Sequence, residues 1–329
     1  MYYKGIFKGA LEFGSERSYS VVKDVYFHKF ENLYKGDVML KSEQMFDDET
    51  FSVSIPHIIS QGTEKSFKNT VGILNCMAEY AVAGQVMGWM TAEGNTTPIY
   101  YQYVEPKGDK SAIQAYLQGK STLAEGKVEE AKDALTTAIE RFARHALAYE
   151  RRGYVNIKLK NYTDALYDYN KSIAINPHHS DAYYGRAIIK VFTKDYAGAI
   201  EDLDLTIKKT FPLQPMYWQA RNMKGECHMQ LKDYVKAAFE YKFFTRREYK
   251  ETDPNFKKRK LAFSNYGKAL VETGDYQEAV VVINKALAIE DSTLKLPFDL
   301  LECKEIAVKH LKAMPPVKAL KRPKPKASR

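Results

Sequence analysis

Small residues recur in this chain at a spacing of 34 positions, and no other feature of the sequence limits its fold as strongly. One series consists of Gly119, Gly153 and Ala187, and a second consists of Ala131, Ala165 and Ala199. A fixed period of this length is typical of stacked copies of one supersecondary unit. The sequence therefore predicts a repeat architecture for the C-terminal two thirds of the chain.

Each copy contains two helical stretches that are joined by a short turn. The turn carries related phrases such as K-N-Y-T-D-A, K-D-Y-A-G-A and G-D-Y-Q-E-A. We expect Asn161, Asp195 and Asp233 to cap the second helix of their copies, because short polar side chains satisfy free backbone N–H groups there. We expect the small residues to let the two helices approach closely, so that larger side chains would strain the interface.

These motifs resemble the tetratricopeptide repeat family, and the resemblance covers about residues 110–291. The fourth and fifth copies carry the small pairs Gly225 with Ala237 and Gly267 with Ala279. The first and last copies depart from the pattern, since Ala143 and Asp291 stand where proline would close the repeat. The resemblance implies a mainly α fold, a right-handed helix–turn–helix solenoid of five repeats.

Two further segments follow the repeats. Residues 294–313 place Leu300, Ile306 and Leu311 around one face, which predicts a cap helix over the apolar flank of the last repeat. The repeat domain is therefore expected to span residues 106–313. Residues 314–329 combine prolines with basic residues, and this composition predicts a disordered, solubilising tail.

Residues 1–105 do not follow the repeat, and we expect them to form a separate small α+β domain. Apolar and polar side chains alternate from Tyr3 to Phe13 and again over residues 51–55, which predicts two strands. The other expected elements are a helix over 64–82, an element of either type over 18–33, and a hairpin over 86–91 and 99–104. No family resemblance is found for this domain.

Motifs that carry chemistry are missing from the sequence. It contains no Gly-rich phosphate loop, no paired-cysteine metal spacing and no Gly-x-Ser-x-Gly motif. We therefore expect no catalytic site, cofactor or metal, and enzymatic activity stays open for residues 1–105 alone. A nucleophilic pair of Cys76 with His28 or His57 is disfavoured, because nothing fixes its geometry. We expect His178 and His179 to lie in a solvent-exposed turn and not at a metal.

The family resemblance also implies a binding surface. Ligands of the family generally lie in a concave groove that is lined by the first helix of each repeat. The corresponding positions in this chain are held by Tyr116, Lys120, Glu150, Tyr154, Ile157, Tyr184, Ile188, Asn222 and Lys268. Tyrosine provides contact area with little loss of side-chain entropy. We therefore expect Tyr116, Tyr154 and Tyr184 to anchor a protein segment, with Tyr154 at the centre.

Two qualifications apply to this groove. One branch of the family grips a peptide carboxylate with Lys, Asn and Arg side chains. At the matching positions of this chain, Lys120 and Arg151 suit an anion, whereas Tyr116, Asp181 and Gly185 do not, so that clamp is mostly absent. The alternative to a binding groove is that its residues belong to the core between repeats or are covered by the N-terminal domain.

The expected function is that of a cytoplasmic adaptor that binds a protein or peptide in the groove. Three isolated cysteines indicate reduced thiols in an intracellular protein. No apolar run approaches the length of a membrane helix, and we expect no membrane partner.

Two other functions remain open from the sequence. In the first, residues 1–105 form a ligand-sensing or enzymatic module that the repeats regulate. In the second, the chain associates with nucleic acid through its basic tail and the basic segment 242–260. Nucleic acid is the less favoured partner, because no aromatic residues are interleaved with the lysines of the tail.

Overall fold

The computed structural model describes residues 2–41, 45–92, 98–107, 110–291 and 293–313. The chain divides into two compact units, Met1–Cys227 and His228–Arg329. The boundary lies within helix α9 (Pro215–Gln230), so the first unit contains the α+β region together with the preceding helices. None of the described helices combines the length and the apolar character that a membrane crossing requires.

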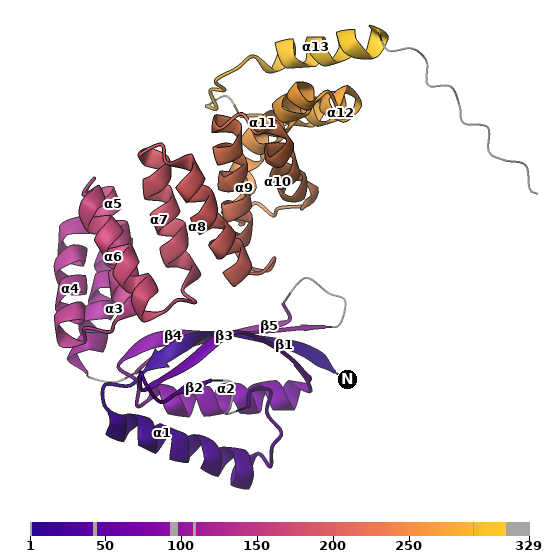
Figure 1. Ribbon diagram of the computed structural model, residues 1–329. Coiled ribbons are helices and arrows are strands. Elements are labelled where there is room, and N and C mark those ends of the chain that lie inside the picture. The colour runs from indigo at the N-terminus through magenta and orange to yellow at the C-terminus, as the bar shows by residue number, and fades with distance from the viewer. Residues whose placement is uncertain (1, 42–44, 93–97, 108–109, 292, 314–329) are drawn as a thin grey trace, which may run out of the picture. The chain divides into compact units, whose positions relative to one another are not determined.

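A five-stranded antiparallel sheet forms the centre of the N-terminal region (Figure 1). The strands are β1 (Tyr3–Glu12), β2 (Phe46–Asp47), β3 (Ser52–Gly62), β4 (Ala83–Ala92) and β5 (Tyr100–Val104). Their order is β2-β3-β1-β4-β5, so the first strand lies in the middle of the sheet. The expected α+β class is confirmed. The pairing of β4 with β5 confirms the expected hairpin, whose turn lies outside the described residues.

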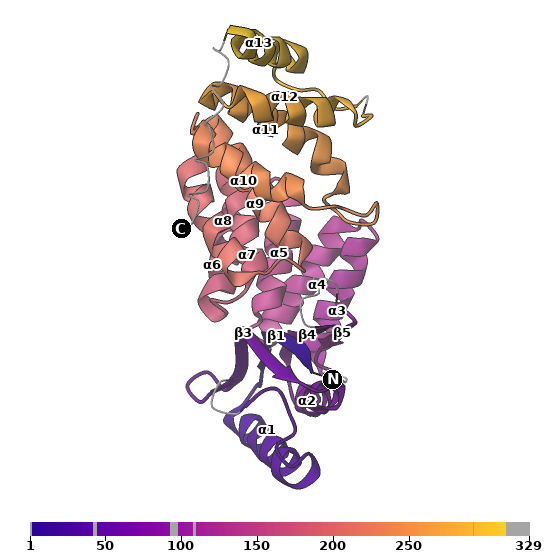
Figure 2. The ribbon, with the colours of Figure 1, turned by 90° about the vertical axis from the view of Figure 1, so that its right-hand side faces the viewer.

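Two helices cover one face of this sheet (Figures 1 and 2). They are α1 (Glu16–His28), which continues into the π-helical turn η1 (Lys29–Leu33), and α2 (Glu64–Ala78). The segment that fitted either a strand or a helix is therefore helical. Thr63 and Ser66 form a capping box that starts α2. The helix ends at Ala78 and not at the expected residue 82, and a turn at residues 79–80 leads toward β4, which begins at Ala83.

The strand pattern explains why this face is apolar. Side chains alternate between the two faces of a strand, and Phe7 and Leu11 of β1 point toward the helices. Both are fully buried, and they share one core with Phe67 and Leu74 of α2 and Val22 of α1. The polar residues Lys8 and Glu12 of the same strand consequently lie on the opposite face of the sheet.

The described residues from 111 to 287 contain five successive helix pairs. These helices are α3 (Ser111–Ala124), α4 (Val128–Arg141), α5 (Ala146–Lys158), α6 (Tyr162–Ile175), α7 (Ser180–Phe192), α8 (Tyr196–Lys209), α9, α10 (Tyr234–Arg246), α11 (Arg259–Thr273) and α12 (Tyr276–Leu287). The expected mainly helical array of helix–turn–helix units is confirmed.

The small residues of the repeat are packing contacts between paired helices. Ala131, Ala165 and Ala199 are fully buried. A Cβ atom added to Gly119 would lie 2.6 Å from Cγ of Leu135 on the partner helix. A larger residue at these positions would therefore force the helices apart.

The turn within each repeat ends the first helix with a residue in the left-handed region. Gly126 and Gly274 have φ values of 81° and 82°, and the equivalent Lys160, Lys194 and Lys232 have φ values of 61°, 64° and 58°. The next residue starts the second helix. Short polar side chains at this position are expected to cap the second helix. Asp195 and Asp233 confirm this, because their side chains accept hydrogen bonds from backbone N–H groups in the first turns of α8 and α10.

Asn161 does not follow the other two caps. Its side chain makes no capping hydrogen bond, so the prediction is wrong for this residue. A neutral amide oxygen accepts a hydrogen bond less strongly than a carboxylate, which is consistent with the difference from the two aspartates.

The second unit ends with α13 (Leu300–Ala313), which confirms the expected cap helix. Leu300 and Cys303 pack against Ile283 and Ala286 of α12 and cover its apolar side. The helix begins at residue 300 and not at 294. The predicted disordered tail, residues 314–329, lies outside the described residues.

The second face of the sheet lies against the repeats of the first unit (Figures 1 and 2). Ile6 and Trp89 on this face form an apolar cluster with Phe211, which follows α8. The ring of Phe211 lies between Trp89 and His57, at centroid distances of 4.8 and 4.9 Å. The sheet is thus a middle layer, with α1 and α2 on one face and the repeats on the other.

Candidate functional site: a cleft between the sheet and the repeats

A cleft of about 830 Å³ opens where the outer face of the sheet meets the first helices of the repeats. One wall comes from β4, β5 and the segment after β5. The other wall comes from α3, α5, α7 and the start of α9. The side chains that give the cleft its character are Trp89, Tyr101, Tyr103, Tyr116, Lys120 and Arg151.

The sheet contributes an aromatic wall. Trp89 pairs in register with Tyr101 across β4 and β5, and their ring centroids are 5.3 Å apart. Tyr103 lies on the same face of β5 as Tyr101, and the two rings meet edge to face with their centroids 4.9 Å apart. Tyr101 and Tyr103 are 40% and 48% exposed, whereas Trp89 is nearly buried. Two tyrosine rings are therefore available to contact a ligand.

The repeats contribute a wall with cationic groups. Tyr116 on α3 is buried against His145, with ring centroids 4.7 Å apart. Lys120, one turn later, lies over the Tyr116 ring and donates a hydrogen bond to Glu105 at 3.1 Å. Arg151 on α5 forms an ion pair with Glu150 at 3.3 Å. The two cations are thus held in place by contacts inside the chain.

The carboxyl groups of this wall are strongly affected by burial. Burial raises the pKa of Glu150 to about 7, although the guanidinium of Arg151 opposes this shift. Burial also disfavours the charged form of Asp181, but His179, Lys8 and Arg151 outweigh it and hold the pKa of this carboxyl below its usual value. Near pH 7, the charge of Arg151 is therefore only partly compensated by its neighbour Glu150.

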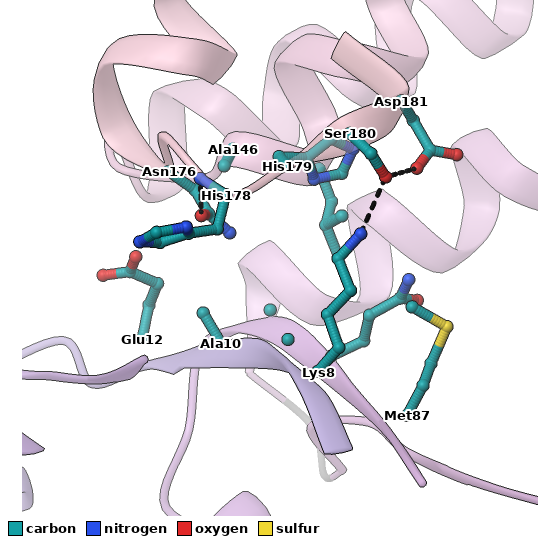
Figure 3. Close-up of a pocket in the computed structure, with 14 residues that line it drawn as sticks. Lys8, Ala10, Glu12, Met87, Ala146, Asn176, His178, His179, Ser180 and Asp181 are labelled. Atoms are coloured by element: carbon teal, nitrogen blue, oxygen red, sulfur yellow. Dashed lines mark hydrogen bonds between the residues drawn. The ribbon is translucent and has the colours of Figure 1, made fainter. Parts of the chain in front are cut away.

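A second, smaller cavity of about 40 Å³ lies beside the cleft, between β1 and the turn before α7 (Figure 3). Nζ of Lys8 donates hydrogen bonds to Oγ of Ser180 at 2.8 Å and to the carbonyl oxygen of Lys209 at 2.7 Å. Lys209 is the last residue of α8, where a positive charge is favourable. Burial lowers the pKa of Lys8 to about 8. Lys8 thus connects the sheet to the third repeat through two hydrogen bonds.

The histidines of the same turn differ from their expected placement. His178 and His179 are partly buried, face the sheet and line the small cavity (Figure 3), so the expectation of a solvent-exposed turn is wrong. Burial lowers the pKa of His179 to about 4. Among the described residues, no cluster of His, Cys, Asp and Glu has the arrangement of a metal site.

The structure brings together only part of the predicted groove. Tyr116 and Lys120 line the cleft, and Glu150 is buried beside it under Arg151. Tyr154 is 38% exposed but does not belong to the cleft lining, and Lys158 lies over its ring. Whether any of these residues binds a partner stays a prediction.

The remaining predicted residues lie elsewhere. Ile157 packs in the core of the second repeat, and Tyr184 packs in the core of the third. Ile188 on α7 is partly buried and does not line the cleft. Asn222 is buried and donates a hydrogen bond to Glu226. Lys268 belongs to the second unit, where its Nζ lies over the Phe298 ring.

The aromatic wall of the sheet was missed from the sequence. The alternation of Tyr101, Gln102 and Tyr103 was a usable signal, because it places both tyrosines on one face of a strand. Nothing in the sequence showed that this face lies opposite the repeats.

Comparison with known proteins agrees with the observed helices. Models described as tetratricopeptide repeat match residues 116–180, 184–241 and 262–293. "Protein SGT1 homolog" of Bos taurus is 34% identical over 91 residues, which cover 28% of this chain and 27% of that protein. "RNA polymerase II-associated protein 3" of Xenopus tropicalis is 23% identical over 188 residues, covering 55% of this chain and 28% of that protein.

The match to these curated relatives spans about a quarter of their own length. Among solved structures, Pseudomonas aeruginosa pilF has a TM-score of 0.48 at 16% identity and covers 62% of this chain and 86% of its own. The family models and the helix pairs identify the same segment. Residues ~116–293 of this chain therefore are tetratricopeptide repeats, a protein–protein interaction domain.

Proposed function

We propose that this chain is an adaptor that binds a peptide segment of a partner protein in the cleft between the sheet and the repeats. The observation that carries this proposal is the pairing of two exposed tyrosine rings, Tyr101 and Tyr103, with the cations Lys120 and Arg151 across the cleft. Tyrosine suits contact with peptides of varied sequence, and lysine and arginine bind carboxylates. The α+β region then has a binding role.

One buried polar atom supports a ligand with its own hydrogen-bonding groups. Oε1 of Gln214 is buried and has no hydrogen-bond partner among the described residues, and its side chain lines the cleft. A buried polar group without a partner costs about 1–3 kcal/mol. Each residue of a peptide backbone supplies an acceptor and, proline aside, a donor. A backbone N–H of an extended peptide can therefore satisfy this oxygen.

We place this adaptor in the cytoplasm. Cys76, Cys227 and Cys303 are all free thiols, and unpaired cysteines are typical of reducing compartments. This placement rests on the cysteines and does not follow from the cleft.

The test is peptide selection on the full chain. Peptides of about twelve residues are selected by phage display, and calorimetry measures the affinity of one selected peptide. We expect Tyr101→Ala to weaken binding by about 2 kcal/mol, roughly thirtyfold. Tyr154→Ala is the matched control, because its ring is exposed to nearly the same extent but lies outside the cleft lining.

The two variants give opposite results if the site is elsewhere. An unchanged affinity in Tyr101→Ala together with a large loss in Tyr154→Ala would place the peptide on the open face of α5 and overturn the proposed cleft. Arg151→Gln adds a second readout. It should reduce affinity most for peptides that carry a carboxylate, since it removes the guanidinium but keeps polar N–H groups.

A further inference from the structure

The second unit contains a separate cleft of about 680 Å³, which is lined by the end of α10, the start of α11 and one side of α12. Much of the basic segment 242–260, noted in the sequence analysis, lines this cleft. Five basic side chains line it, Lys242, Arg246, Arg247, Arg259 and Lys285, against the two acidic side chains Glu248 and Glu278. The cleft therefore has an excess of three positive charges.

From this excess and the contacts described below, we propose that this basic cleft binds an acidic segment of a partner protein. The inference is independent of the peptide cleft in the first unit, because the two clefts share no residue.

Three of the five cations are oriented by contacts within the unit. Arg259 lies 3.6 Å from the centre of the Phe256 ring and donates a hydrogen bond to the Phe256 carbonyl. Arg247 pairs with Asp253 at 3.5 Å, and Lys242 pairs with Glu278 at 3.6 Å. These contacts pre-organise the basic wall, which lowers the entropy lost when a ligand binds.

The other two cations are available to a ligand. Arg246 and Lys285 are exposed, and neither forms an ion pair with any residue that the structure describes. Glu278, one of the two acidic residues that line the cleft, already pairs with Lys242 and accepts a hydrogen bond from the hydroxyl of Tyr266 at 2.7 Å. Carboxylates of a partner would consequently meet Arg246 and Lys285 first.

The aromatic residues of the cleft favour a peptide over a nucleic acid. The rings of Tyr249 and Tyr266 are buried, with 7% and 3% exposure, and the Tyr249 hydroxyl donates to the Phe244 carbonyl. Their faces are thus not open to stack on bases, as single-stranded nucleic acid requires. Val281 is 53% exposed beside the cations and offers an apolar contact. The matching ligand is an acidic peptide with one apolar side chain.

The experiment uses the full chain and a fluorescent peptide of about twelve residues that contains aspartate, glutamate and one leucine. Fluorescence anisotropy at low salt measures its affinity. We expect the double variant Arg246→Gln with Lys285→Gln to weaken binding about tenfold or more. We also expect the affinity of the wild-type chain to fall as salt rises, because exposed charges are screened.

The matched control is Lys250→Gln with Lys257→Gln, which removes two exposed positive charges that do not line the cleft. An equal loss in this control would show attraction to net charge and would overturn the cleft as a site. Tighter binding of a single-stranded RNA of equal length, with the same dependence on Arg246 and Lys285, would also overturn the proposal in favour of nucleic acid. Thermal melts of both variants confirm that each is folded.

Discussion

Glu12 is an ionisable side chain that lies almost fully buried between β1 and the repeats of the first unit. Its exposure is 4%, and its nearest cation is Arg144, whose Nε lies 3.6 Å from the carboxylate. Burial raises the pKa of this carboxyl to about 7, against the opposing effect of Arg144. The sequence could not reveal this state, because Glu12 and Arg144 come from different regions of the chain and meet only when the sheet docks on the repeats.

This residue predicts a specific pH dependence of stability. Between pH 4.5 and 7 the folded state binds more protons at Glu12 than the unfolded state, so the stability contribution of this group is lost as pH rises through that window. We expect Glu12→Gln to be more stable than the wild type at pH 8, by roughly 3 kcal/mol at most, and equal to it near pH 4.5. Urea unfolding at several pH values measures the difference.

Two outcomes would contradict the predicted pH dependence at Glu12. A constant difference between the two proteins from pH 4.5 to pH 8 would show that Glu12 titrates normally in the folded state. A variant that is less stable at every pH would show that the ion pair with Arg144 outweighs burial.

At the scale of elements, the close packing within each repeat depends on small side chains. Ala199 on α8 is fully buried, whereas Ala197 on the same helix is exposed. We expect Ala199→Leu to lower the free energy of unfolding by about 1–3 kcal/mol through overpacking, and Ala197→Leu to change it by less than about 0.5 kcal/mol. Denaturant midpoints of the two variants test this. Equal effects would contradict the packing role of the repeat alanines.

The sequence predicted these helices well because each one is specified locally. The spacing of Ala165 and Ala199, and the capping aspartates Asp195 and Asp233, depend on residues within one repeat. The candidate site was less predictable. Tyr101 and Tyr103 meet Tyr116 and Arg151 across a cleft, and this arrangement depends on the docking of two structures whose sequences show no common pattern.

At the scale of the molecule, the first unit depends on the contact between the sheet and the repeats. The ring of Phe211 is 7% exposed and lies between His57 and Trp89. Lys8 adds a polar link a short distance away along the same sheet face. Trp89 is also in contact with Tyr101. The contact between Phe211 and Trp89 therefore supports the aromatic wall of the peptide cleft.

Removing the Phe211 ring should therefore affect both stability and binding. We expect Phe211→Ala to lose about 3 kcal/mol of stability through the cavity it leaves, and to shift Trp89 fluorescence toward that of a hydrated indole, because the ring covers Trp89. Trp218 is replaced by Phe in both proteins compared, so that Trp89 alone is observed. The affinity for a peptide selected on the wild-type chain should fall together with the stability.

Phe192→Ala is the control for this last variant, since Phe192 is 60% exposed and lies on α7 of the same unit. It should leave both Trp89 fluorescence and peptide affinity unchanged. If Phe211→Ala were destabilised while peptide affinity stayed at the wild-type level, the sheet would not be a wall of the binding site, and the repeats alone would hold the peptide. The coupling of sheet and repeats requires that Phe211→Ala alone shifts Trp89 fluorescence and lowers both stability and affinity.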